Sequence, residues 1–168
     1  MRIAVIGAGM AGVAAAHTLA AAGHDVTVFN RTIGTAERWV RQYGGRTAAT
    51  PADAARDAAI VFACVGRDAD LAEVTRGSQG AFQAMRAGGL FVDHTTASAG
   101  IARALAEAAR EGGFGFVDAP VSGGEQGAKN GQLTIMCGGS TADYDKAAPV
   151  MRSRTDCIAV CTWQPLSV

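Results

Sequence analysis

The feature that most constrains the fold of this chain is a set of three glycines between a predicted strand and a predicted helix. Ile3–Ile6 is a short apolar run, residues 7–12 have the spacing G-x-G-x-x-G, and Ala11–Ala22 is an alanine-rich helical stretch. In this order the first glycine permits a tight turn, the second lets a pyrophosphate approach the backbone, and the third packs helix against strand. The N–H groups and positive dipole end of the helix favour phosphates. The motif therefore predicts a dinucleotide-binding site that comprises Gly7, Ala8, Gly9, Met10, Ala11 and Gly12.

Short apolar runs alternate with longer amphipathic stretches through most of the sequence. This alternation implies right-handed crossovers and a parallel sheet with helices on both faces. The predicted fold class is α/β, a doubly wound, mostly parallel sheet of the Rossmann NAD(P)-binding type. The predicted strands are Ile3–Ile6, Val26–Phe29, Ile60–Cys64, Leu90–Val92, Phe114–Val117 and Gln132–Cys137. The predicted helices are Ala11–Ala22, Thr35–Tyr43, Asp68–Thr75, Gln79–Met85, Ser98–Glu111 and Ala142–Met151, with N-caps at Thr35 and Ser98 and C-terminal caps at Gly23, Gly44, Gly88 and Gly112.

Composition and charge exclude several classes of protein. The 168 residues are enough for one domain, and a chain that is 49% apolar and 18% charged is neither a disordered tail nor a coiled coil. Fifteen basic residues balance fifteen acidic ones, so nothing indicates a nucleic-acid surface or a polybasic membrane anchor. No run reaches the roughly 20 apolar residues of a membrane span, and the first residues do not resemble a signal peptide. The sequence therefore predicts no nucleic-acid or membrane partner.

The four cysteines indicate neither a metal site nor a disulfide framework. Cys64, Cys137, Cys157 and Cys161 form no C-x-x-C pair, and the sequence has no paired histidines at metal-ligand spacing. Buried, reduced thiols are typical of proteins in a reducing compartment. We therefore expect a cytoplasmic location and no bound metal.

The residues that end the second predicted strand indicate which dinucleotide binds. An NAD site places Asp or Glu there to accept a hydrogen bond from the ribose 2′-OH. This chain has Asn30, Arg31 and Thr32 instead, a neutral amide, a guanidinium that can pair with a 2′-phosphate, and a hydroxyl donor. The pattern predicts NADP, with NAD left as the other possibility. The alternative for Arg31 is an ordinary solvated surface arginine.

Three further stretches follow predicted strands, where open α/β sheets bind their ligands. The first is Cys64-Val65-Gly66-Arg67, and the second is Asp93-His94-Thr95-Thr96, whose threonine hydroxyls could meet a ribose or a nicotinamide amide. For His94 a structural or surface role is favoured over catalysis. The third contains Ser122, Gly123 and Gly124, whose exposed N–H groups suit a carboxylate. A plain turn is the alternative there.

Taken in order, these motifs resemble those of the β-hydroxyacid dehydrogenases, the family that includes 3-hydroxyisobutyrate dehydrogenase. The most specific stretch is Phe116–Gly124, supported by residues 127–134 behind it. The resemblance implies an NADP(H)-dependent oxidoreductase that transfers hydride between the cofactor and a small β-hydroxyacid or semialdehyde. It implies that residues 7–12 hold the pyrophosphate and that Asn30, Arg31 and Thr32 hold the adenosine ribose and 2′-phosphate. It further implies a nicotinamide side formed by Cys64, Val65 and Gly66 with Asp70 nearby, a ribose contact at Thr96, and a substrate carboxylate site at Ser122, Gly123 and Gly124.

The chain departs from that family after about residue 151. The resemblance makes residues 1–151 the dinucleotide-binding domain and 152–168 an atypical tail without glycine. The family carries its acid/base lysine in a glycine-rich segment that opens a second, helical domain. Lys129 and Lys146, the two lysines here, do not match that position. The comparison with that family therefore predicts a missing helical domain, a truncated or frame-shifted product or a gene remnant, and an isolated chain without useful turnover. A deliberate single-domain protein with its own C-terminal ending is the alternative.

Other functions remain open at this stage. A non-catalytic NADP-binding module, acting as a sensor or partner subunit, is the main alternative. Imine reduction is a third interpretation, which the carboxylate-binding logic of Asp118–Gly124 disfavours. A homo-oligomer is possible through apolar surface that a second domain would otherwise cover. The motifs do not specify which hydroxyacid or semialdehyde is the substrate.

Overall fold

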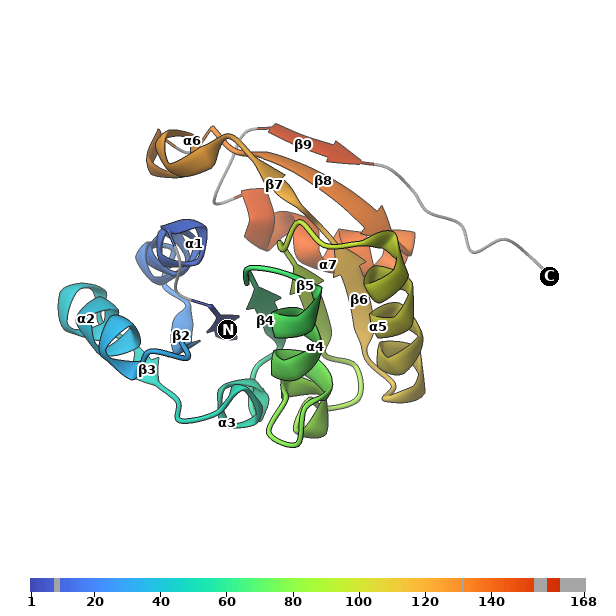
Figure 1. The fold of residues 1–168 in the computed structure, drawn as a ribbon. Helices are drawn as coiled ribbons and strands as arrows, with labels where there is room; N and C mark the ends of the chain where they lie inside the picture. Colours follow the sequence, from blue (N-terminus) through green and yellow to red (C-terminus); the bar gives the residue numbers. More distant parts are fainter. Residues whose placement is uncertain (8–9, 131, 153–156, 161–168) are drawn as a thin grey trace.

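The computed structural model describes residues 1–7, 10–130, 132–152 and 157–160, which form a twisted sheet with helices on both faces (Figure 1). The strands are β1 (Arg2–Ile6), β2 (Asp25–Phe29), β3 (Arg46–Thr47), β4 (Ile60–Ala63), β5 (Leu90–Asp93), β6 (Gly115–Asp118), β7 (Val121–Ser122), β8 (Thr134–Gly139) and β9 (Cys157–Val160). The helices are α1 (Met10–Ala21), α2 (Ile33–Tyr43), α3 (Pro51–Ala55), α4 (Asp68–Arg76), α5 (Ala99–Glu111), α6 (Gly124–Asn130) and α7 (Thr141–Arg152), with a short 3₁₀ helix, η1, at Ala81–Gln83.

The sheet order is β3-β2-β1-β4-β5-β6-β8-β7, with β9 beside β8. The first six strands in that order are parallel, whereas β8 runs antiparallel to both β6 and β7. The chain order reverses at β1, which lies between β2 and β4. This arrangement confirms the predicted doubly wound, mostly parallel α/β fold.

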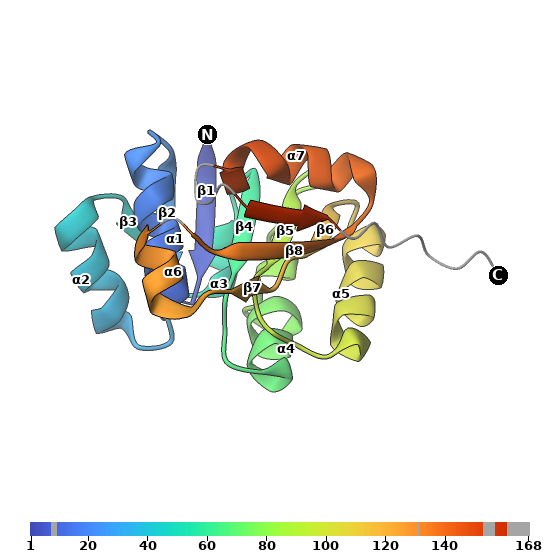
Figure 2. The same cartoon turned by 90° about the horizontal axis from the view of Figure 1, so that it is seen from above.

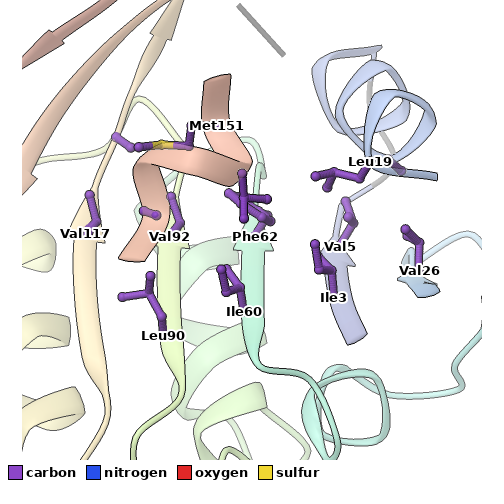
Figure 3. Close-up of a cluster of buried hydrophobic side chains, with 14 of the residues drawn as sticks. Ile3, Val5, Leu19, Val26, Ile60, Phe62, Leu90, Val92, Val117 and Met151 are labelled. Carbon is purple, nitrogen blue, oxygen red and sulfur yellow. The ribbon is translucent and has the colours of Figure 1, made fainter. Parts of the chain in front are cut away.

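Two hydrophobic cores lie on opposite faces of the sheet because successive strand residues point to opposite sides. Ile60 and Phe62 enter the core covered by α1, α2 and α7, whereas Val61 and Ala63 enter the core covered by α3, α4 and α5. Seen from above, α7 and α4 lie on opposite sides of β4 and β5 (Figure 2). In the close-up, Phe62 of β4 and Val92 of β5 lie beneath the helix that carries Met151 (Figure 3). This two-sided burial fixes the face of the sheet that each strand residue enters.

Helix caps explain where several elements begin and end. Ser98 is the N-cap of α5, as predicted, and its hydroxyl accepts a hydrogen bond from the Ile101 N–H. Gly44 ends α2 with a φ of 80°, also as predicted. The predicted N-cap at Thr35 was wrong, because α2 begins at Ile33 and Thr32 occupies the N-cap position.

The predicted helix Gln79–Met85 was also wrong, since only the 3₁₀ turn η1 forms there. The chain folds back closely onto the end of α4 at Gly80, where a Cβ would lie 2.3 Å from the Thr75 carbonyl oxygen. The short stretch that remains before β5 accommodates a single turn. Gly88 consequently caps no helix; it occupies a turn, with a φ of 80°, and donates to the Gly113 carbonyl.

Several small elements escaped the sequence prediction. The helix α3 is short, with Thr50 as N-cap and Pro51 at its first position, and β3 and β7 are each two residues long. Cys157–Val160, within the segment predicted to be a tail, forms β9 and pairs in parallel with β8. The domain boundary at residue 151 stays a prediction, but the sheet includes residues beyond it.

Candidate functional site

A cavity of about 780 Å³ opens at the carboxyl edge of β1, β2 and β4. Gly7, Asn30 and Cys64 each directly follow one of these strands, so the reversal of strand order at β1 brings them together. Nine of the predicted site residues line the cavity: Gly7, Asn30, Arg31, Thr32, Cys64, Val65, Gly66, Asp70 and Gly124. Its volume falls within the range of about 300–1,000 Å³ that small-molecule and cofactor sites occupy.

The turn after β1 requires glycine at position 7. Gly7 has a φ of +92°, and a Cβ there would lie 2.2 Å from the Cys64 carbonyl oxygen. The Gly7 N–H donates to the Phe29 carbonyl at 2.9 Å, which ties the turn to the end of β2. The steric requirement at Gly7 therefore belongs to the tight turn after β1 at the edge of the cavity, the role expected of the first glycine of the motif.

The rest of the glycine motif is described only in part. The backbone of residues 10–12 forms the first turn of α1, so the motif does open a helix. The predictions for Ala8 and Gly9 lie outside the described residues. The strand–turn–helix context that the motif requires is present around them.

Two arginines and one aspartate lie together near the end of β2. The Arg31 guanidinium lies 3.3 Å from Asp70 Oδ1, and Arg67 Nε lies 3.5 Å from Asp70 Oδ2. Two guanidinium groups thus share one carboxylate, and the Arg31 side chain remains 88% exposed. Asn30 donates from Nδ2 to the Thr32 carbonyl at 2.9 Å. Residues 30–32, which follow β2, include no acidic side chain. The arrangement can receive an anion such as a 2′-phosphate.

The ends of β4 and β5 are joined by hydrogen bonds beside the cavity. The Val65 N–H donates to Thr95 Oγ1 at 3.1 Å, and the Thr95 N–H donates to Asp93 Oδ1 at 2.9 Å. Burial raises the pKa of the Asp93 carboxyl to about 6. Thr95 is buried, whereas Thr96 is exposed and does not line the cavity. The contact of Thr96 with a ribose stays a prediction.

His94 makes structural contacts. It is buried, its ring stacks on Phe62 with centroids 5.4 Å apart, and Nδ1 lies 2.6 Å from the Ala119 carbonyl oxygen. These contacts tie the end of β5 to its neighbours β4 and β6. The geometry agrees with the structural role favoured for this histidine.

The predicted carboxylate loop lies at the rim of the cavity. Gly123 and Gly124 have φ values of 126° and 60°, a pair of left-handed conformations that glycine adopts at little cost. Ser122 is exposed at the end of β7, and its backbone is held by pairing with Thr134 of β8. Of the three residues only Gly124 lines the cavity. The role of Ser122 and Gly123 toward a substrate stays a prediction.

About half of the residues that line the cavity were not predicted as site residues from the sequence. Around α3 and α4 the lining includes residues that no motif contained: Ala49, Thr50, Pro51, Glu73, Val74 and Gln79. Three further lining residues lay within the motifs but were assigned no role: Phe29, Val121 and Leu133. For α3 there was a local signal, because a threonine followed by proline and, two residues later, aspartate is typical of a helix start. Glu73 and Gln79 had none, since their positions depend on how α4 packs.

The described residues contain neither a cluster that could hold a metal nor a membrane-spanning helix. No group of three or more His, Cys, Asp or Glu side chains converges among them. None of their helices has the length and hydropathy needed to cross a bilayer.

Residues 2–162 match the family described as the NAD binding domain of 6-phosphogluconate dehydrogenase. The chain is 49% identical over 156 residues to an uncharacterised oxidoreductase of Shewanella frigidimarina, which covers 93% of this chain and 54% of that protein. It is 38% identical to the probable 3-hydroxyisobutyrate dehydrogenase-like 2, mitochondrial, of Arabidopsis thaliana, over 90% of this chain and 50% of that protein. The chain thus spans about half the length of these curated relatives.

Solved structures give the same picture. The 3-hydroxyisobutyrate dehydrogenase of Mycobacterium tuberculosis, solved with L-serine, is 30% identical with a TM-score of 0.87, over 96% of this chain and 54% of that one. A protein solved in complex with NADP+ and 2-OPP is 25% identical with a TM-score of 0.89, over 95% of this chain and 56% of that one.

Proposed function

The chain belongs to the family of the NAD-binding domain of 6-phosphogluconate dehydrogenase and its 3-hydroxyisobutyrate dehydrogenase-like relatives, and from that membership we propose that its cavity binds NADP(H). In this proposal the chain supplies the cofactor-binding part of an oxidoreductase that acts on a small β-hydroxyacid or semialdehyde. The observation that carries the proposal is the glycine turn after β1, where Gly7 has a φ of +92° and no room for a Cβ beside Cys64, at the edge of the cavity. In this motif such a turn directs the N-terminus of the following helix toward a bound pyrophosphate.

The choice of NADP over NAD rests on the turn after β2. Asn30 brings no negative charge to repel a 2′-phosphate, and Arg31 is exposed at the cavity mouth. Arg67, which ends the stretch after β4 and was assigned no role from the sequence, adds a second guanidinium through their shared partner Asp70. A charge-assisted pair between guanidinium and phosphate is among the stronger polar contacts in proteins. The NADP+ complex of the solved relative is further support.

The substrate would lie between the nicotinamide side of the cavity and the β7–α6 loop. Bound NADP(H) would supply the hydride that is exchanged with the carbonyl or hydroxyl carbon of the substrate. Val65 and Gly66 would line the nicotinamide side, and Thr96 would reach a ribose hydroxyl from the neighbouring turn. Ser122, Gly123 and Gly124 would orient the substrate carboxylate with backbone N–H groups and one hydroxyl.

One observation favours a second candidate, a non-catalytic NADP-binding module. Lys146 is exposed on α7, and the described lining of the cavity contains no lysine that could act as acid or base. General acid–base catalysis contributes about 10²–10⁴-fold to a rate. The 168 residues alone are therefore expected to bind NADPH and to turn over slowly, whereas a partner or further domain with a lysine would restore the rate.

The binding proposal is tested by titrating the chain with NADPH and NADH and following cofactor fluorescence. We expect NADPH to bind more tightly, and Arg31→Ala to weaken NADPH binding about tenfold while it changes NADH binding less than about twofold. Arg41→Ala is the matched control, since Arg41 is an exposed arginine of α2 that does not line the cavity. Equal affinities for both cofactors in the unmodified chain would contradict the NADP preference. Binding of neither would contradict the proposal as a whole.

A further inference from the structure

The carboxyl group of Asp93 is buried in a way that calls for an explanation. Asp93 ends β5 with 0% exposure, and its Oδ2 atom has no hydrogen-bond partner among the described residues. A buried polar atom without a partner costs free energy, so such atoms are rare and often mark functional places. The mechanism proposed above assigns this carboxyl no role.

The charged groups around Asp93 oppose its ionisation. Asp118 lies beside it in register on β6, and Asp68 acts on it from the first turn of α4. Desolvation by burial is the main cause that raises the pKa of Asp93 to about 6, and both acidic neighbours act in the same direction. His94, the next residue, stacks on Phe62, a member of the core on the other face of the sheet. No cationic group therefore offsets the charge of Asp93 among the groups that act on it.

The donors that do favour the ionised form belong to Thr95. Asp93 Oδ1 accepts from the Thr95 N–H at 2.9 Å, and the Thr95 side chain also acts to lower the pKa of the carboxyl. The Thr95 hydroxyl oxygen in turn accepts from the Val65 N–H at 3.1 Å.

This chain of hydrogen bonds ends at the cavity wall. Val65 lies in the turn between β4 and α4, and it lines the cavity together with Cys64 and Gly66. The carboxylate holds Thr95 through its backbone N–H, and the Thr95 hydroxyl in turn holds the Val65 peptide. A protonated carboxyl is a weaker acceptor, so protonation of Asp93 would loosen its hold on Thr95.

We propose that Asp93 is a positioning residue, which acts through Thr95 to hold the Val65 turn in its cofactor-binding arrangement and releases that turn when it is protonated. The inference rests on the proposed function, because it concerns the affinity of the same cavity for NADP(H). It makes cofactor binding weaken as the pH falls through about 6. Burying the Asp93 carboxylate is unfavourable, and in this proposal the return is a cavity wall that is already ordered before the cofactor binds.

The first test follows the relay without cofactor. In a pH titration by ¹H–¹⁵N NMR, the Val65 amide resonance of the unmodified chain should shift with a midpoint near 6. The same resonance should not titrate in Asp93→Asn, whose side chain keeps a carbonyl acceptor but carries no charge. A Val65 resonance that titrates identically in both proteins would overturn the inference, whatever the cofactor does.

The second test measures the affinity for NADPH between pH 5 and pH 8. We expect the dissociation constant of Asp93→Asn to be high throughout, and that of the unmodified chain to rise toward pH 5 about three- to tenfold more than that of the variant. The 2′-phosphate of NADPH titrates with a pKa near 6 itself. That contribution is common to both proteins, so the difference between their profiles isolates Asp93. Parallel profiles for the two proteins would overturn the inference.

Thr95 provides the matched pair of variants. Thr95→Val removes the hydroxyl at nearly constant volume and should weaken NADPH binding at pH 8 while it flattens the pH profile. Thr95→Ser keeps the hydroxyl and should restore both the affinity and the pH dependence. If NADPH does not bind at any pH while the Val65 resonance still titrates with Asp93, the proposed function fails and the relay stands. Failure of Thr95→Ser to rescue would overturn the relay.

Discussion

Arg31 and Asp70 are 39 positions apart in the sequence, yet Nη1 of the arginine lies 3.3 Å from Oδ1 of the aspartate at the mouth of the cavity. The pair connects the turn after β2 with the first turn of α4. Asp70 also holds Arg67 at 3.5 Å, so one carboxylate restrains two guanidinium groups. Exposed ion pairs of this kind contribute at most about 1 kcal/mol, so a phosphate can displace the carboxylate.

Replacing Asp70 is therefore expected to strengthen NADPH binding. Asp70→Asn leaves Arg31 and Arg67 without their shared counter-charge, and the NADPH dissociation constant should fall about two- to fivefold. The NADH constant should change less, since NADH lacks the 2′-phosphate. Fluorescence titration of both cofactors measures the effect, with Asp145→Asn on the exposed face of α7 as control. Weaker NADPH binding by Asp70→Asn would instead mean that Asp70 orients the arginines.

Substitution of Gly7 should damage both stability and binding. In Gly7→Ala the new Cβ meets the Cys64 carbonyl oxygen at 2.2 Å, and the backbone must also keep a φ of +92°. We expect a loss of more than about 2 kcal/mol in unfolding free energy and no measurable NADPH binding. Gly23→Ala is the control, because Gly23 has a similar φ of +82° but nothing lies within 4 Å. It should cost about 1 kcal/mol and leave NADPH binding intact. Equal losses of stability in the two variants in urea unfolding would contradict this account.

The raised pKa of Asp93 predicts a specific dependence of stability on pH. A carboxyl whose folded pKa lies near 6, above its ordinary 3.8, binds protons more tightly in the folded state. Its stabilising contribution is therefore complete below pH 3.8 and is lost as the pH rises through 6. Relative to Asp93→Asn, the unfolding free energy of the unmodified chain should rise by about 1 kcal/mol between pH 7 and pH 5. Urea unfolding of both proteins across that interval measures the difference, and a constant difference would contradict the raised pKa.

Ser98 is expected to stabilise α5 through its side chain. Its hydroxyl accepts from the Ile101 N–H at 3.3 Å and donates to Asp68 at the start of α4. Ser98→Ala should lower the unfolding free energy by about 1 kcal/mol, and Ser98→Thr should retain most of it. The hydrogen bonds from Ser98 lower the pKa of Asp68, so the pKa of that carboxyl should rise toward its ordinary value in Ser98→Ala. Carboxyl NMR titration would detect the change, and an unchanged pKa would show that the contact does not persist in solution.

Local patterns predicted the elements that bury a complete face. The apolar runs Ile60–Ala63 and Leu90–Asp93 are strands because both of their faces are covered, and the glycine motif begins α1 as its spacing requires. The two-residue strands β3 and β7 are too short for a periodic signal, since their positions come from pairing with longer neighbours. In the strand Cys157–Val160 the β-branched residues Ile158 and Val160 alternate with Cys157 and Ala159. This short pattern was not interpreted as a strand because the segment lacks the glycines of the family pattern.

The site was predictable where a residue directly follows a strand. Gly7, Asn30 and Cys64 follow β1, β2 and β4, and strand order alone brings them to one cavity. Glu73 and Gln79 reach the same cavity only through the packing of α4 and the turn that follows it, which no local pattern encodes. The partnership of Asp93 with Val65 through Thr95 likewise depends on the register between β4 and β5.

The alternation of β4 and β5 between two cores has a consequence for protein engineering. Deleting one residue inside either strand would exchange its two faces, and it would also shift Cys64 out of line with β1 or His94 out of line with β4. A graft of the cavity onto another scaffold would therefore have to include the complete strands β4 and β5. Changes in chain length are better tolerated at the opposite edge of the sheet, for example at the open turn around Gly23. A library that diversifies loops there would leave the cofactor site untouched.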